Sequence, residues 1–262
     1  MSGTTIVGMD LRTADKLGAS PHISRAMRQL HRVPFAARTV LERVSGRSIF
    51  EASYYRESQL TRLVNLFAFN DVERWRGMRV LEVGAGLGHL GDAFTHIGFD
   101  VSSTDGRPEH VEAMRMRGRE SFVLDLDEVG VDQVGDFELI LAFGVLYHLA
   151  RPEEFLRSCA VKGRVLLLET VVCDEREPVI KWVDESGGWL GQDQAVSRRG
   201  CRPSPSWVEQ TCRDAGFTTV RDISSPLANW RIGSFDWEPH FTGAWTRKGV
   251  NLRKMWVCER EG

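Results

Sequence analysis

A carboxylate followed by a glycine-rich turn is the pattern in this sequence with the clearest chemistry. Glu82 lies in a short apolar run, and Gly84, Gly86 and Gly88 follow it within RVLEVGAGLGHLG. Glycines let the backbone bend sharply and let a ligand approach the main chain, while the N–H groups of the next helix attract an anion. The dinucleotide fingerprint G-x-G-x-x-G would need glycine where His89 stands, and a pyrophosphate would lie close to the Glu82 carboxylate. The turn therefore suits a ligand with an amino acid tail and no phosphate better than NAD or FAD.

Two aspartates further along the chain supply groups for the nucleoside part of such a ligand. Asp105 ends an apolar run, where a carboxylate can accept hydrogen bonds from both ribose hydroxyls; the alternative is an aspartate that caps the next helix. Asp125 can accept from the exocyclic amine of adenine with Leu126 against the ring, and we expect Asp127 and Glu128 to be solvated. S-adenosylmethionine fits, because carboxylates balance its ammonium or sulfonium charge and its own carboxylate can face the turn amides. The predicted cofactor-binding residues are Glu82, Gly84, Ala85, Gly86, Asp105, Gly106, Asp125, Leu126 and Phe143.

The residues that could act on an acceptor follow two further apolar runs. In DFELILAFGVLYHL, residues 136 to 149, a central strand opens into a loop that carries Tyr147 and His148, and Glu169 lies at the end of the run RVLLLET. Open α/β sheets bind ligands at the carboxyl ends of their strands, so we expect these side chains near the reacting methyl group. His148 is the candidate general base; the alternative is a histidine hydrogen-bonded to a nearby loop. Alignment supplies much of the acceleration of methyl transfer, so a base is required only if the acceptor arrives protonated.

Several of these stretches resemble a known family. LEVGAGLGHLG is similar to the first motif of the class I S-adenosylmethionine-dependent methyltransferases, and GVLYHLARP, LLLETVVCD and RPSPSWVEQTCRDAGF resemble one branch of them. This branch includes the enzymes that modify the wobble uridine of transfer RNA, together with relatives that act on sugars and natural products. The resemblance covers roughly residues 76 to 223. It implies that Asp105 binds the ribose of the cofactor.

The elements that must position these residues follow an α/β pattern. Short apolar runs are expected as strands of a parallel sheet, and helical stretches separate them. Together with the resemblance, this pattern predicts an α/β, Rossmann-like, doubly wound sheet of seven strands, mostly parallel with the last antiparallel. The predicted strands cover residues 80–83, 99–103, 121–124, 137–142, 164–170, 218–223 and 254–258.

A helical cap is expected before this sheet, over residues 1–75, with the methyltransferase domain over residues 76–262. Residues 22–44 mix apolar side chains with arginines at helical spacing. These arginines are either solvated on an amphipathic cover or part of a flap that binds an anionic substrate; they are Arg25, Arg28, Arg32, Arg38 and Arg43. A second helix is predicted over residues 57–70, and Tyr54 and Tyr55 before it could reach substrate or pack.

Two segments exceed a minimal methyltransferase fold. Residues 174–203 are expected to form a structureless loop, and a loop of this size in a compact domain is usually a functional lid. It contains Trp182, Asp184, Glu185, Gly187, Gly188, Trp189, Gln192 and Gln194. The insertion at residues 224–253 concentrates aromatic side chains, which suggest a platform for a sugar or a flat ring; a satellite core is the alternative, and both can hold at once. Its ring-bearing residues are Trp230, Phe235, Trp237, His240, Phe241 and Trp245.

Composition limits the remaining classes of protein. The 262 residues carry a formal net charge of −2, so the chain as a whole is not drawn toward nucleic acid or an acidic membrane. The five cysteines include no C-x-x-C pair, which indicates neither a disulfide framework nor a zinc site and favours a reducing cytoplasm. Neither a signal peptide nor a membrane span is predicted. The dispersed histidines indicate no metal site.

The sequence thus predicts an S-adenosylmethionine-dependent methyltransferase that acts on an oxygen or nitrogen of a small molecule, such as a sugar or a secondary metabolite. One alternative is a transfer RNA methyl- or carboxymethyltransferase, supported by the motif resemblance and by the arginines between residues 25 and 43. Against it stand the small net charge and the lack of a recognised RNA-binding module. A second alternative is a non-catalytic cofactor-binding protein. The acceptor and the oligomeric state stay open at this point.

Overall fold

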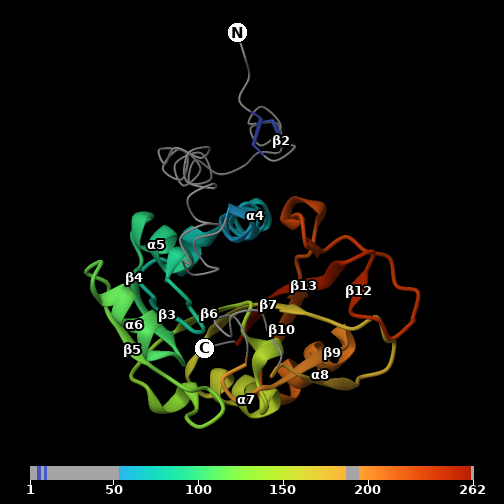
Figure 1. Ribbon diagram of the computed structural model, residues 1–262. Helices are drawn as coiled ribbons and strands as arrows, with labels where there is room; N and C mark the ends of the chain where they lie inside the picture. Colours follow the sequence, from blue (N-terminus) through green and yellow to red (C-terminus); the bar gives the residue numbers. More distant parts are fainter. Residues whose placement is uncertain (1–4, 7–8, 11–52, 187–194, 261–262) are drawn as a thin grey trace.

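The computed structural model describes residues 5–6, 9–10, 53–186 and 195–260 of the chain (Figure 1). Two short strands, β1 (Thr5–Ile6) and β2 (Met9–Asp10), pair antiparallel near the N-terminus. The basic segment predicted to be helical, residues 22–44, lies outside the described residues, and so does its flap function. No helix in the described part of the chain is both long enough and apolar enough to span a bilayer.

The predicted sheet is confirmed: seven strands follow the order β10-β13-β7-β6-β3-β4-β5. Strands β3 to β7 run parallel to one another, and β13 is antiparallel to both of its neighbours. The central strands β6 and β7 are buried along their whole length, which explains their continuous apolar sequences. The strands are β3 (Arg79–Glu82), β4 (Asp100–Asp105), β5 (Ser121–Val123), β6 (Leu139–Phe143), β7 (Val165–Val171), β10 (Thr219–Asp222) and β13 (Val250–Glu259).

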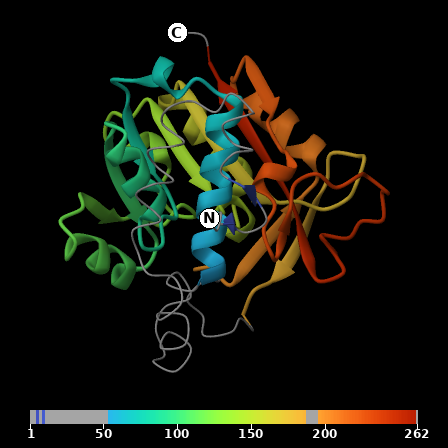
Figure 2. The same cartoon turned by 90° about the horizontal axis from the view of Figure 1, so that it is seen from above.

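Helices cover both faces of this sheet, so the fold is a three-layer α/β arrangement (Figures 1 and 2). One apolar cluster joins the sheet to α4 (Ser53–Phe69) and α5 (His89–His96), and a second joins it to α7 (Pro152–Lys162) and α8 (Pro205–Ala215). The remaining described helices are α6 (Pro108–Arg115) and the 3-10 turns η2 (Val72–Trp75), η3 (Val131–Gln133), η4 (Leu146–His148) and η5 (Pro226–Ala228).

Local sequence sets several of these boundaries. Helix α8 begins at Pro205, because the Ser204 hydroxyl accepts a hydrogen bond from the Trp207 N–H and proline suits the first turn of a helix. It ends at Gly216, whose φ of 115° is open to glycine. Helix α4 contributes Leu63, Leu66 and other residues to the same apolar cluster as the sheet, so this part of the predicted cap packs directly on the core.

The expectation of a structureless lid over residues 174–203 was wrong for the part that the structure describes. Strand β8 (Ile180–Asp184) pairs antiparallel with β9 (Arg199–Pro203) and forms a hairpin beside the main sheet. The sequence RGCRP of β9 has little strand propensity, and its pairing with β8 comes from tertiary packing that a local pattern cannot show. Of the predicted lid, residues 187–194 lie outside the described residues, including Trp189, Gln192 and Gln194.

The aromatic insertion at residues 224–253 contributes to the core and also reaches the surface. Trp230 and Phe235 belong to the cluster beneath α4, with ring centroids 5.7 Å apart. Phe241 and Trp245, in contrast, are exposed. Strand β13 begins at Val250 rather than at residue 254, and two-residue strands β11 (Gly233–Ser234) and β12 (Thr246–Arg247) pair with this extension. The satellite-core interpretation therefore holds for Trp230 and Phe235.

Candidate functional site

The glycine turn after β3 has the backbone conformation that its sequence predicts. Gly84, Gly86 and Gly88 adopt φ values of 59°, 56° and 72°, in the left-handed region that side chains avoid. A Cβ on Gly84 would lie 2.5 Å from Cγ2 of Val145, so glycine is required there for space as well as for conformation. The Ala85 N–H donates to the Thr104 carbonyl at 2.8 Å, which fastens the turn to the neighbouring strand β4.

Glu82 lies buried at the end of β3. Its carboxylate accepts a hydrogen bond from the Ser103 hydroxyl at 2.7 Å, and the Gly91 N–H of helix α5 also donates to it. Burial raises the pKa of Glu82 to about 7, because these two donors offset only part of the lost hydration. Glu82 borders a small second cavity with Gly84, Ala85 and Phe143, and it does not line the main one. Direct contact between Glu82 and a cofactor stays a prediction.

The main cavity opens at the carboxyl ends of the parallel strands and has a volume of about 410 Å³. That volume lies within the usual range for a small-molecule site. Its wall brings together seven of the twelve site residues predicted from the sequence. The other five are absent from the lining: Glu82, Ala85, Gly86, Phe143 and Glu169. The seven that line it are Gly84, Asp105, Gly106, Asp125, Leu126, Tyr147 and His148.

Asp105 lines this cavity and also links the glycine turn to the start of α6 by hydrogen bonds. One carboxylate oxygen accepts the Gly86 N–H at 2.8 Å, and the other accepts the Arg107 N–H at 2.9 Å and lies 3.0 Å from Nδ1 of His110. The helix-capping alternative is not shown, because the Asp105 carboxylate accepts from the N–H of Arg107, which precedes α6, and from no backbone N–H within the helix. Support of the glycine turn was not foreseen. These hydrogen bonds are compatible with a ribose contact, which stays a prediction.

Asp125 and Asp127 also line this cavity. The Asp125 carboxylate accepts the Asp127 N–H at 3.0 Å. Asp127, which we expected to be solvated, instead accepts the N–H groups of Ala150 and Arg151 at 2.8 and 2.9 Å. It thereby holds the start of α7, while Glu128 is exposed as expected. The position of Asp127 therefore follows from the need to satisfy backbone donors between two helices.

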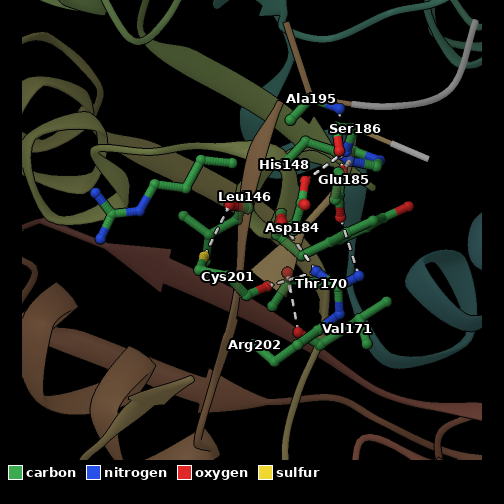
Figure 3. A network of polar contacts seen from close by, with 12 residues as sticks. Leu146, His148, Thr170, Val171, Asp184, Glu185, Ser186, Ala195, Cys201 and Arg202 are labelled. Atoms are coloured by element: carbon green, nitrogen blue, oxygen red, sulfur yellow. Dashed lines mark hydrogen bonds and ion pairs between the residues drawn. The ribbon is translucent and has the colours of Figure 1, made fainter. Parts of the chain in front are cut away.

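His148 pairs with a carboxylate from the β8–β9 hairpin. Its Nδ1 lies 2.5 Å from Oε2 of Glu185. Figure 3 shows the two side chains pointing toward each other. Oε2 also accepts the Ala195 N–H at 3.0 Å, and Oε1 accepts a hydrogen bond from Arg202 at 3.0 Å. Burial opposes ionisation of Glu185, but the hydrogen bond and charge of His148 and the charge of Arg202 outweigh it and lower the pKa of Glu185 to about 2. Because the carboxylate engages Nδ1, Nε2 is the ring nitrogen left for an acceptor.

Sequence reasoning missed the role of Glu185. It appeared there only as one polar residue of the expected lid, and no motif connects it to His148, which lies 37 residues earlier. The hairpin brings the two together: the Cys201 thiol of β9 donates to the Leu146 carbonyl of η4 at 3.4 Å, and Arg202 donates to the Tyr147 carbonyl at 3.1 Å. The loop-bound alternative for His148 is therefore half right, since its partner is on that loop but is a carboxylate.

Glu169 does not line the cavity, although we expected it to face an acceptor. It is fully buried at the end of β7 and forms ion pairs of 2.7 Å with Arg62 of α4 and 2.7 Å with Arg253 of β13. Burial opposes its ionisation, but the charges of Arg253 and Arg62 prevail and keep the pKa of Glu169 below its usual value. The two arginines do line the cavity, and Arg253 lies 3.4 Å from the Tyr147 hydroxyl. The basic side of the site was not predicted.

The described residues contain no group of three or more histidine, cysteine, aspartate or glutamate side chains that could hold a metal ion. What they do contain is one cavity whose lining includes the carboxylates of Asp105 and Asp125, the His148–Glu185 pair and the arginines Arg62 and Arg253. This arrangement can hold a nucleoside by its hydroxyl and amine groups, and it can accept a proton from a hydroxyl or amine.

Comparison with known proteins agrees with this geometry. A family model described as a methyltransferase domain matches residues 52–222. Ubiquinone biosynthesis O-methyltransferases from Xanthomonas oryzae pv. oryzae and from Bordetella avium are 32% and 31% identical to this chain over 90 and 91 residues. Each match covers 32% of this chain and 38% of the relative, so the similarity spans less than half the length of those proteins.

Solved structures extend the likeness over most of the fold. The N-terminal domain of EvdMO1, crystallised in the presence of S-adenosylhomocysteine and D-fucose, superimposes with a TM-score of 0.60 at 18% identity, over 80% of this chain and 86% of that one. Magnesium protoporphyrin IX methyltransferase from Synechocystis PCC 6803, with bound S-adenosylhomocysteine, gives a TM-score of 0.51 at 14% identity, over 96% of this chain and 100% of that one. These likenesses concern the fold.

Proposed function

Because the chain belongs to the class I S-adenosylmethionine-dependent methyltransferases, with S-adenosyl-L-methionine as cofactor, we propose that it methylates an oxygen or nitrogen atom of a small molecule such as a sugar or a secondary metabolite. The observation that carries this proposal is the placement of His148 and its partner Glu185 in one cavity with Asp105 and Asp125. The name O-methyltransferase of the curated relatives favours oxygen.

The cofactor end of the cavity is assigned to the residues around β4 and β5. The described residues fit an adenosyl group, because Asp105, Asp125 and Leu126 line the cavity together and offer carboxylate acceptors and an apolar contact to a nucleoside. Asp105 would hold the ribose hydroxyls and Asp125 the adenine amine, with Leu126 against the ring. Glu82, Ala85, Gly86 and Phe143 would shape the turn and the tail site from beneath.

The acceptor end is assigned to Tyr147, His148 and the residues that hold them. When bound, the cofactor supplies an electrophilic methyl group on its sulfonium. Nε2 of His148 takes the proton from the acceptor hydroxyl or amine, while Glu185 fixes the ring tautomer and stabilises the positive charge that the ring acquires. Tyr147 orients the acceptor, and Glu169 acts through the two arginines that it pairs with rather than by contact.

The β8–β9 hairpin is proposed as the lid of this site. Val196 packs directly against Gly106, where an added Cβ would lie 2.9 Å from its Cγ2, and the Ala195 N–H donates to Glu185. Movement of the hairpin would therefore separate Glu185 from His148 and, at the same time, move Val196 away from Gly106. The division of the chain into a cap before residue 76 and a domain after it is retained as part of this proposal.

The test is to incubate the protein with methyl-labelled S-adenosylmethionine and fractions of a metabolite extract, and to identify the labelled product by mass spectrometry. A labelled small molecule with a new O- or N-methyl group supports the proposal. Label in transfer RNA, with a salt-dependent shift of that RNA on a gel, would replace it with the nucleic-acid alternative, because phosphate contacts release counterions. The arginines that could serve such a contact, residues 25–43, lie outside the described residues.

The five cysteines bear on the compartment. All five are buried and unpaired in the structure. Free thiols persist in reducing surroundings, so we infer a cytoplasmic location.

A further inference from the structure

Two buried arginines share a single carboxylate at the acceptor end of the cavity. Arg62 and Arg253 are 3% and 5% exposed, and each forms one ion pair, with the same fully buried Glu169. Arg62 lies in helix α4 and Arg253 in strand β13, the neighbour of β7. Because these elements are far apart in the sequence, no local pattern predicts the pairing. Together, the two arginines and Glu169 carry a net charge of +1.

Neighbouring groups do not balance that charge. The other contacts that the structure records for these guanidinium groups are neutral: the hydroxyls of Ser58 and Tyr147, at 3.4 Å each, and the indole ring of Trp230, whose centroid lies 5.0 Å from Arg62 and 4.9 Å from Arg253. The Nε atoms of both arginines are buried and have no hydrogen-bond partner among the described residues.

The other carboxylates that line the cavity form no recorded ion pair with Arg62 or Arg253. Glu185 is paired with His148 and Arg202, and Asp184 accepts the Ser186 N–H at the exposed edge of the hairpin. Asp105, Asp125 and Asp127 accept backbone N–H groups at the end assigned to the cofactor, as described above. Arg107 and His110, which also line the cavity, contact Asp105.

A buried positive charge without a partner is costly, and cost of this kind is tolerated where a ligand supplies the partner. The bound cofactor would increase the imbalance, since its sulfonium brings a further positive charge to the reacting methyl group. A negatively charged acceptor would balance both charges. Guanidinium groups suit this purpose because they bind carboxylates and phosphates through paired N–H groups.

We propose that the methyl acceptor carries an anionic group, a carboxylate or a phosphate, and that Arg62 and Arg253 bind it beside Trp230. This inference rests on the proposed function and narrows its substrate class. The arginines are binding and orienting residues: they fix the acceptor by its charged group so that the hydroxyl or amine to be methylated faces His148.

The test measures binding of small aromatic probes to the full-length protein saturated with S-adenosylhomocysteine, by isothermal titration calorimetry. Benzoate and phenyl phosphate carry the two candidate anions, and benzamide is a neutral analogue of benzoate. We expect at least one anion to bind tenfold or more tightly than benzamide, and the tighter of the two identifies the anion as carboxylate or phosphate. Equal binding of benzamide and both anions would overturn the proposal.

Variants locate the anion. R253Q removes the excess charge and should abolish the preference for the anion, whereas R74Q, which changes an exposed arginine paired with Glu259, should keep it. E169Q raises the local charge and should strengthen anion binding. Retention of the full preference in a folded R253Q would contradict the assignment. If R253Q does not fold, R62Q, which removes the same charge at the other arginine, and the wild-type comparison of probes still decide it. If the wild-type protein does not bind S-adenosylhomocysteine at all, the proposed function is wrong, and this result is distinct from a failure of the anion proposal.

Discussion

Nδ1 of His148 lies 2.5 Å from Oε2 of Glu185, across the boundary between the main sheet and the β8–β9 hairpin. The carboxylate is anchored by Ala195 and Arg202 as well, so its position does not depend on the histidine alone. A carboxylate that fixes Nδ1 presents Nε2 as the acceptor of a proton. This relationship converts a strand-end histidine into a candidate general base with a defined tautomer.

If the two residues work as a unit, their removal should not be additive. H148Q and E185Q should each lower the single-turnover rate of methyl transfer by roughly 10²-fold, and the double variant should be little slower than either. E177Q changes an exposed carboxylate just before strand β8; it serves as the matched control and should leave the rate unchanged. The rates are to be measured with the acceptor found by labelling. Full-rate methylation by H148Q would remove the general-base assignment.

Asp105 should contribute to cofactor binding as well as to the glycine turn. D105A should weaken binding of S-adenosylhomocysteine at least tenfold, which corresponds to about 1.4 kcal/mol. D100N changes a mostly exposed aspartate at the other end of the same strand and should leave the affinity as it is. Calorimetry on the two variants, with thermal unfolding as a check that D105A is folded, makes the comparison. Unchanged affinity in D105A would refute its assignment to the ribose.

Gly84 should be intolerant of any side chain. G84A combines a left-handed backbone with a Cβ 2.5 Å from Val145, and the two together should lower the free energy of unfolding by about 2–4 kcal/mol. G77A is a matched control, because Gly77 also has a positive φ of 89° but open space around it, so only the backbone strain remains. Urea unfolding at one pH measures both. The double variant G84A/V145A should recover part of the loss, and equal losses in G84A and G77A would mean that the clash is absent.

Glu82 should make stability depend on pH near neutrality. Its pKa in the folded protein, about 7, lies above the usual value of a glutamate, so the folded state binds the proton more tightly than the unfolded chain. Stability contributed in this way is present below about pH 4.5 and is lost as the pH rises through 7, by up to about 3 kcal/mol. The wild type should therefore lose more stability between pH 5 and pH 8 than E82Q does. E120Q, in an exposed carboxylate that accepts from Ser102, should behave as the wild type; identical pH profiles for the wild type and E82Q would contradict the raised pKa.

The local parts of the fold could be predicted from the sequence because their causes are local. The apolar run before Gly84, the capping serine and proline at Ser204 and Pro205, and the strand that ends at Asp105 each specify their conformation within a few residues. Their places in the sheet then follow from the usual order of an α/β fold. That Asp105 and Asp125 line the cavity could be predicted for the same reason, since both follow strand ends; their contact with a cofactor stays a prediction.

The acceptor end could not be predicted in this way, because its contacts join distant segments. Arg62 and Glu169 are separated by 107 residues, and Glu169 and Arg253 by 84. Neither arginine belongs to a recognisable motif. Glu169 was correctly predicted near the end of a strand, but it is buried between two arginines and does not face the cavity. The hairpin strand β9, with the sequence RGCRP, is likewise specified by its partner and not by its own residues.

The most direct test is a crystal structure of the protein with S-adenosylhomocysteine. We predict that the ribose hydroxyls lie within hydrogen-bonding distance of Asp105, that the adenine amine faces Asp125, and that the sulfur atom points toward the space between His148 and Arg253. A ligand bound elsewhere, or one whose sulfur faces away from His148, would contradict the assignment of this cavity as the site of methyl transfer.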